Sequence, residues 1–331
     1  MRVAIPFVAV LILFLLAYFG VESAGLRTVF GVVFPYIAIV LFAVGLVYKV
    51  IRWAMVPVPF RIPTTCGQQK SLPWIKPSKL ENPTSTLGVI GRMLLEILFF
   101  RSLFRNTRTE IRKDGPRVAY GSNKWLWFFG MVFHWSMLII LIRHLRFFTE
   151  PVPRAITLLQ DVDGFFQIGV PVFYATTILF LLAVGWLFLR RVVSPQLRYI
   201  SLANDYFPLF LLLGIGTTGF LMRHLMKTDI VAVKELTLGL LSFNPAAPAE
   251  ASGMFYAHLF LVCVLFAYFP FSKLTHMAGV FLSPTRNLAN NNRVVRHVNP
   301  WNYPVKVHTY QEYEQEFGEK MKKAGVPLDK E

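Results

Sequence analysis

The chain has 331 residues, of which 55% are hydrophobic and only 16% are charged, and its mean hydropathy is +0.50. This composition lies outside the range of soluble globular domains and excludes an ordinary soluble enzyme. The net charge of +16 is concentrated in a few segments between long apolar stretches, which argues against nucleic-acid binding and indicates a membrane protein with basic loops.

Six apolar stretches are each long enough to cross a lipid bilayer as a helix. A spanning helix needs about 20 largely apolar residues. The first stretch continues without a cleavage site, so we interpret it as a span and not as a signal peptide. The sequence therefore predicts an all-α membrane protein with six transmembrane helices, at about residues 3–21, 29–53, 124–148, 167–193, 204–225 and 253–275.

The basic residues lie in three segments that the six spans place on one side of the membrane. These segments are 61–117, 190–198 and 273–296. Basic loops are retained on the cytoplasmic side, so we expect all three segments to face the cytoplasm. The sequence then predicts a multi-pass protein of the cell membrane with both termini in the cytoplasm.

We divide the chain into an N-terminal transmembrane hairpin, a long cytoplasmic loop, a core and a tail. Their ranges are 1–53, 54–123, 124–277 and 278–331. The loop opens with a proline-rich run at 57–83, which excludes regular helix or central strand there. Residues 87–105 then have the pattern of an amphipathic helix lying along the membrane surface, or alternatively of a re-entrant or spanning segment.

The tail is polar and too small for a core of its own, and it carries a helical pattern from Tyr310 to Lys323. We expect this tail and the loop to form a docking platform for a cytoplasmic subunit. The two cysteines, Cys66 and Cys263, lie in the loop and in the last span, so we predict no disulfide. Neither has the spacing of an iron–sulfur ligand, and any such cluster must belong to a partner.

Four histidines lie in or next to the third and sixth spans, where an ionisable side chain is unfavourable unless it has a function. His134 and His144 are ten residues apart, and His258 and His276 are eighteen apart. Because the two spans are antiparallel, His134 matches the depth of His276, and His144 matches that of His258. This pattern predicts two haem irons in a bundle of four to five helices, each iron held by one histidine from each span.

The two histidine spacings do not agree in a regular helix. Ten residues rise roughly 15 Å and eighteen rise roughly 27 Å. Pro270 lies between His258 and His276, and we expect a kink or an unwound turn there to shorten the second distance.

Further residues near the outer ends of the spans are suited to haem and quinone. Arg143, Arg146 and Arg223 are predicted to pair with haem propionates, or else to reach the membrane interface. His224 and Lys227 are candidates for a quinone site, and His224 is also a rival ligand for the outer haem. Small residues such as Gly219 would allow close approach to a porphyrin, or plain helix packing.

The spans and histidine spacings resemble those of the NarI family, the cytochrome b subunits of respiratory nitrate reductases. Within that family the chain is most similar to the DsrM/HmeC type, from the sulfite-reductase-associated Dsr (Hme) membrane complex of sulfur-metabolising prokaryotes. The runs Arg61–Lys70, Leu72–Lys76 and Phe100–Phe104 resemble the cytoplasmic loop of that type. The extra N-terminal span and the long loop depart from nitrate reductase subunits, so quinone-site residues are not carried over.

This resemblance implies two haem b groups with bis-histidine ligation, and menaquinol as electron donor or menaquinone as acceptor. It also implies a partner resembling heterodisulfide reductase, which carries the cytoplasmic iron–sulfur clusters, and other membrane and periplasmic subunits of the Dsr/Hme complex. We expect an electron-transfer subunit that oxidises menaquinol near the outer face. A proton channel or transporter using a histidine relay, and a haem-free membrane anchor, are the alternatives.

Overall fold

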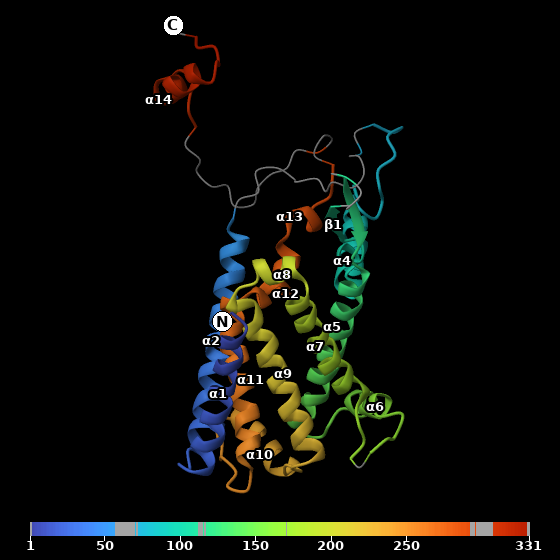
Figure 1. The fold of residues 1–331 in the computed structure, drawn as a ribbon, viewed down its shortest axis with the longest axis vertical. Helices are drawn as coiled ribbons and strands as arrows, with labels where there is room; N and C mark the ends of the chain where they lie inside the picture. Colours follow the sequence, from blue (N-terminus) through green and yellow to red (C-terminus); the bar gives the residue numbers. More distant parts are fainter. Residues whose placement is uncertain are drawn as a thin grey trace.

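The computed structural model describes residues 2–56, 70, 72–111, 115, 117–169, 171–291, 295 and 307–329 (Figure 1). Within these residues, six helices are long and apolar enough to cross a membrane, which confirms the predicted all-α membrane fold. They are α1 (Ala4–Glu22), a π-helical turn Val29–Val33 continuing into α2 (Phe34–Ala54), α5 (Lys124–His144) with a 3₁₀ turn Leu145–Phe147, α7 (Ala175–Val193), α9 (Ala203–His224), and α11 (Gly253–Tyr268) with a 3₁₀ turn Phe269–Phe271.

Helix α11 lies at the centre of the bundle. It packs against α1, α2 and α9, while α7 packs against both α5 and α9. In α11, 44% of the spanning residues are buried, compared with 11–22% in the other five spans. Tyr256 and Leu261 of α11 are almost fully buried; Phe30 belongs to the same core cluster as Tyr256, and Val10 of α1 to the same cluster as Leu261. The sixth span therefore has the most protein around it and the least lipid.

The predicted start of the fourth span, at residue 167, is wrong. The helix begins at Ala175, because the preceding backbone turns through positive φ at Gln167 and Gly169 and then meets Pro171. An apolar composition over 167–174 extended the hydropathy pattern beyond the helix. Glycine and proline decide where the helix starts in this segment.

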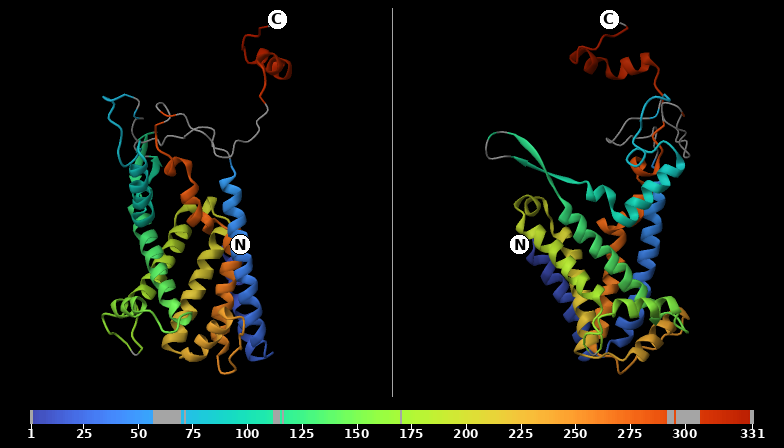
Figure 2. Two further views of the ribbon diagram at one scale, coloured as in Figure 1. Left: turned by 180° about the vertical axis from the view of Figure 1, so that it is seen from behind. Right: turned by 90° about the vertical axis from the view of Figure 1, so that its right-hand side faces the viewer.

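The loop between α2 and α5 holds two short helices and a β-hairpin. Helix α3 (Thr86–Phe99) ends at Phe100, whose left-handed backbone (φ 48°) separates it from α4 (Arg101–Phe104). The predicted helix over 87–105 is therefore broken. Strands β1 (Thr107–Ile111) and β2 (Val118–Ser122) pair antiparallel, with Thr109 opposite Tyr120, and project from the bundle (Figure 2). Most of the proline-rich run, with Cys66 and Arg61–Gln69, lies outside the described residues.

The remaining elements are short helices at the two ends of the bundle. In Figure 1 both chain termini lie at the same end as α8, α12, α13 and β1, whereas α6 and α10 lie at the opposite end. The bounds are α6 Arg154–Asp163, α8 Pro195–Ile200, α10 Ile230–Leu241, 3₁₀ turn Lys273–Thr275, α12 His276–Gly279, 3₁₀ turn Val280–Leu282, α13 Pro284–Asn287 and α14 Tyr310–Lys323. Helix α14 has the predicted bounds.

The loop and the first part of the tail are joined by hydrogen bonds and ion pairs. Glu81 forms ion pairs with Arg101 and Arg105, and Glu96 accepts from the backbone N–H and hydroxyl of Ser102 at 2.9 and 2.7 Å. Arg286 of the tail lies 3.4 Å from Glu96. The backbone N–H of Asn290 donates to the carbonyl of Pro83 at 2.8 Å. Residues 81–105 and 286–290 therefore form one folded unit, which we call the platform.

Candidate functional site

The inner histidine pair is brought together by a break at the end of the sixth span. Helix α11 stops at Tyr268, a 3₁₀ turn follows around Pro270, and His276 is the first residue of α12. His258 and His276 are therefore not on one continuous helix. The ring centroids of His134 and His276 lie 5.8 Å apart, with the planes at 86° to each other. The break ends the regular helical rise between His258 and His276, and it places the ring of His276 beside that of His134.

The outer pair is formed by the last residue of α5, His144, and by His258 in the second turn of α11. Helix α9 approaches His258 closely, because a Cβ atom added at Gly219 would lie 3.3 Å from the His258 Cε1 atom. Gly219 therefore leaves space that the imidazole ring of His258 uses, whereas the predicted close approach to a porphyrin stays a prediction.

In all four histidines the Nδ1 atom has a hydrogen-bond partner. The Nδ1 atoms of His134, His144 and His276 lie 2.7–2.8 Å from the backbone carbonyls of Gly130, Ile140 and Lys273. The Nδ1 atom of His258 lies 2.8 Å from the hydroxyl of Thr218. A carbonyl only accepts, so in the three bonds to carbonyls Nδ1 carries the proton. The Nε2 lone pairs are then available to a metal, which is the arrangement of metal-ligating histidines.

The four rings do not sit in the apolar core, where a structural histidine would be packed. In the chain itself His134, His144 and His276 are exposed, and His258 is half-buried. No group of three or more histidine, cysteine, aspartate or glutamate side chains is placed to hold a metal ion within the described residues. Two pairs of imidazoles instead fit a group that brings its own equatorial ligands, as haem does.

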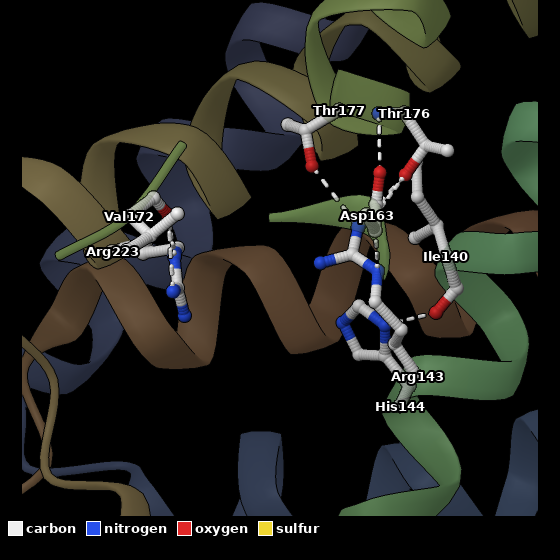
Figure 3. A network of polar contacts seen from close by, with 8 residues as sticks. All are labelled: Ile140, Arg143, His144, Asp163, Val172, Thr176, Thr177 and Arg223. Atoms are coloured by element: carbon white, nitrogen blue, oxygen red, sulfur yellow. Dashed lines mark hydrogen bonds and ion pairs between the residues drawn. The ribbon is translucent and has the colours of Figure 1, made fainter. Parts of the chain in front are cut away.

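A buried ion pair lies beside His144. Arg143 Nε is 3.0 Å from the Asp163 carboxylate, and the two side chains are only 8% and 3% exposed. Asp163 also accepts from the backbone N–H and the hydroxyl of Thr176, at 2.8 and 2.6 Å, and Arg143 donates to Thr176 and Thr177 (Figure 3). This network joins α5, α6 and α7 at the end of the bundle that carries α6 and α10, and it balances the charge of Arg143 within the chain.

The two other predicted propionate partners have different surroundings. Arg223 donates to the carbonyl of Val172 at 3.1 and 3.2 Å, and its guanidinium lies 4.1 Å from the ring centroid of Tyr174. Arg143 contacts the same ring at 3.9 Å. Arg146 lies 5.8 Å from the ring centroid of Phe147. Tyr174 thus holds two cations near the outer histidines.

The quinone-site candidates lie at the same end of the bundle. The ring of His224 stacks on Phe173 at 4.1 Å and contacts Phe220 at 4.7 Å. The same two phenylalanines line a cavity of about 400 Å³, together with Ile178, Leu181 and Leu182 of α7. Lys227 is exposed and has a positive φ of 40°, just beyond the end of α9. An apolar cavity beside an imidazole suits a hydrophobic, redox-active ring.

The sequence analysis did not identify two residues of this site. They are Asp163 and Thr218. Their roles depend on contacts between helices far apart in the chain, from α6 to α5 and from α9 to α11. In the sequence, Asp163 could be noticed only as an acid close to a span, and Thr218 only as a hydroxyl within the run Gly216–Gly219.

Comparison with known proteins identifies a family and three relatives. The sequence model of the nitrate reductase gamma subunit family matches residues 92–298. A protein of Archaeoglobus fulgidus named "Hdr-like menaquinol oxidoreductase cytochrome b-like subunit" is 45% identical over 280 residues, which cover 82% of this chain and 83% of the relative. A protein of the same name from Archaeoglobus profundus is 41% identical over 274 residues, which cover 81% of this chain and 81% of the relative.

A more distant relative is the respiratory nitrate reductase 1 gamma chain of Escherichia coli. It is 29% identical over 130 residues, covering 37% of this chain and 56% of the relative. The family match includes all four histidines of the two pairs and begins after the N-terminal hairpin. The chain is therefore a multi-pass membrane protein that belongs to the nitrate reductase gamma subunit family.

Proposed function

We propose that the chain is a di-haem cytochrome b subunit that takes electrons from menaquinol near the outer face and passes them to a cytoplasmic iron–sulfur partner. The observation that carries this proposal is the shared pattern of the four histidines: each Nδ1 is hydrogen-bonded and each Nε2 is left for a ligand. Haem, when bound, supplies one-electron transfer between the two faces.

The residues of the chain hold and orient the two groups. His134 with His276 would ligate the inner haem b, and His144 with His258 the outer one. Arg146 and Arg223 are left as propionate partners, whereas Arg143, which is paired with Asp163, orients the end of α5 from which His144 projects. The directions inner and outer follow the basic segments, which we place in the cytoplasm with both termini.

Menaquinol is the proposed donor because two relatives are named menaquinol oxidoreductase subunits and because the outer end has a suitable site. The ring of His224 beside the apolar cavity would accept a quinol proton, and Lys227 would add a positive charge there. Protons would then be released outside while electrons move inward.

The proposed partner is an iron–sulfur subunit resembling heterodisulfide reductase, in a larger complex of dissimilatory sulfur metabolism. The word "Hdr-like" in the names of the two relatives supports the heterodisulfide-reductase-like partner. The platform supports it too, because Trp127 and Trp135 of α5 donate to the carbonyls of Phe99 and Leu98, at 2.7 and 3.1 Å. The ring of Phe100 lies 4.9 Å from His134, so a subunit docked on the platform would be next to the inner pair.

An optical spectrum of the purified protein tests the proposal. We expect reduced b-type bands after dithionite treatment and two haems per chain by pyridine haemochrome. His134→Ala and His258→Ala should each remove one haem, because each takes a ligand from a different pair. The control His224→Ala should keep two. A colourless protein would refute the proposal and favour the histidine relay or the haem-free anchor. Two haems in both ligand variants would refute the assigned histidine pairs.

A further inference from the structure

We propose that Thr218 is a positioning residue that tunes the outer haem alone, through its hydrogen bond to His258. The inference rests on the proposed function, since it concerns the chemistry of a histidine ligand. Thr218 lies in α9 and His258 in α11, and the two atoms, Oγ1 and Nδ1, are 2.8 Å apart. Thr218 is 5% exposed, so water does not compete for this bond.

The surroundings of the hydroxyl decide which atom donates. Thr218 Oγ1 lies 2.8 Å from the carbonyl oxygen of Gly214 and 3.0 Å from that of Ile215. A hydroxyl has a single proton and carbonyls only accept, so that proton points to one of the two carbonyls. The Oγ1 lone pairs then accept the proton of His258 Nδ1. This fixes the tautomer in which Nε2 is unprotonated and directs the ring toward its ligand.

The other three histidines have no such side-chain partner. Each bonds to a backbone carbonyl three or four residues earlier in its own segment, which no substitution of a side chain removes. His258 is also held from a different helix, so its orientation depends on how α9 packs on α11. Among the four described ligand candidates, only this one has an Nδ1 acceptor that sequence variation can change.

The acceptor affects how strongly the imidazole donates electrons. A hydrogen bond accepted from Nδ1–H raises the basicity of the ligand, which favours the more oxidised iron. The Thr218 hydroxyl is itself polarised by donating to a carbonyl, and this strengthens it as an acceptor. Removing it should raise the midpoint potential of the outer haem and leave the inner one unchanged.

The experiment is an optical redox titration of the purified protein with three matched variants. Thr218→Val keeps the shape of the side chain and removes the hydroxyl, so that only backbone carbonyls of α9 are left near His258. Thr218→Ser restores the hydroxyl, and Thr217→Val makes the same change at the exposed neighbour in α9. A His144→Ala variant, which lacks an outer ligand, assigns the two transitions.

We expect Thr218→Val to retain two haems and to show an upward shift of the outer transition only. Thr218→Ser and Thr217→Val should titrate like the unaltered protein. An unshifted outer transition in Thr218→Val, or an equal shift in Thr217→Val, would overturn the proposal. If Thr218→Val loses the outer haem, the Thr218→Ser variant becomes the test. The proposal is supported if Thr218→Ser keeps both haems and titrates like the unaltered protein. It is refuted if Thr218→Ser loses the outer haem as well. Absence of haem from the unaltered protein would instead refute the proposed function.

Discussion

At the scale of single residues, the outer end of the bundle depends on one buried pair of charges. Arg143 and Asp163 are shielded from solvent, and removing one partner of such a pair leaves the other as an isolated buried charge. Thr176 donates to both oxygens of the carboxylate, from its backbone N–H to Oδ1 and from its hydroxyl to Oδ2, which also faces Arg143. The pair therefore fixes α6 against the residue that precedes His144.

Asp163→Asn tests this role, because it removes the charge and keeps most of the shape. Breaking a buried ion pair typically destabilises a protein by about 3–5 kcal/mol. We expect a lower thermal midpoint in detergent, and a change in the spectrum of one haem only. Asp161→Asn, an exposed acid on the same helix, is the matched control and should behave like the unaltered protein. Equal melting of both variants would show that the pair has no structural role.

At the scale of elements, the platform is held by Glu81. Partial burial raises the pKa of this carboxyl, but hydrogen bonds and charge from Arg101 and Arg105 outweigh burial, and the pKa lies below its ordinary value of 4.5. A carboxyl with a lowered pKa contributes stability above its ordinary pKa. That contribution disappears as the pH falls through the lower, folded value.

Hydrogen exchange of the α3–α4 segment measures this dependence. We expect its amides to be equally protected from pH 7 to pH 5, after correction for intrinsic rates, and to lose protection in more acidic buffer. Glu81→Gln should show the weaker protection already at pH 7. Glu110→Gln removes a carboxylate that pairs with Arg108 on the exposed hairpin and should leave α3–α4 protected. Protection in Glu81→Gln equal to that of the unaltered protein would contradict the assignment.

The helices could be predicted from the sequence more readily than the turns between them. In lipid, a stretch of about 20 apolar residues can satisfy its backbone hydrogen bonds only as a helix, so the sequence predicts such spans well. Five of the six spans begin within about one residue of the predicted positions. The hairpin β1–β2 was missed, although Asp114–Gly115 between two alternating runs is a hairpin signal. The position of His276 required the path of the chain after Pro270, which no local pattern gives.

At the scale of the whole molecule, the two ends have different chemistry. The end with α6 and α10 carries His224 and its apolar cavity, and the end with α8 and α12 carries the platform (Figure 1). The histidine pairs lie between them in the order that antiparallel α5 and α11 impose. The sequence could predict this order from topology alone, whereas the stacking of His224 on Phe173 comes from packing between segments.

A double variant, His224→Ala with Lys227→Ala, tests this polarity. We expect the haems to be reduced at least tenfold more slowly by a menaquinol analogue, because a quinol-proton acceptor and a nearby positive charge are lost. Dithionite should still reduce both haems fully. His308→Ala with Lys320→Ala, which changes the same residue types on the tail, is the control. If menaquinol reduces the double variant as fast as the control, quinol is oxidised elsewhere.

The N-terminal hairpin has a consequence for neighbours in the membrane. Helices α1 and α2 cover one flank of α11, and the carboxylate of Glu22 accepts from the first backbone N–H of that helix, Gly253, at 2.6 Å. The two helices therefore prevent another membrane subunit from packing against this flank of α11. An additional integral subunit on this side would therefore meet α1 and α2, where Ile12, Leu16 and Val44 are exposed, and would have no direct contact with α11.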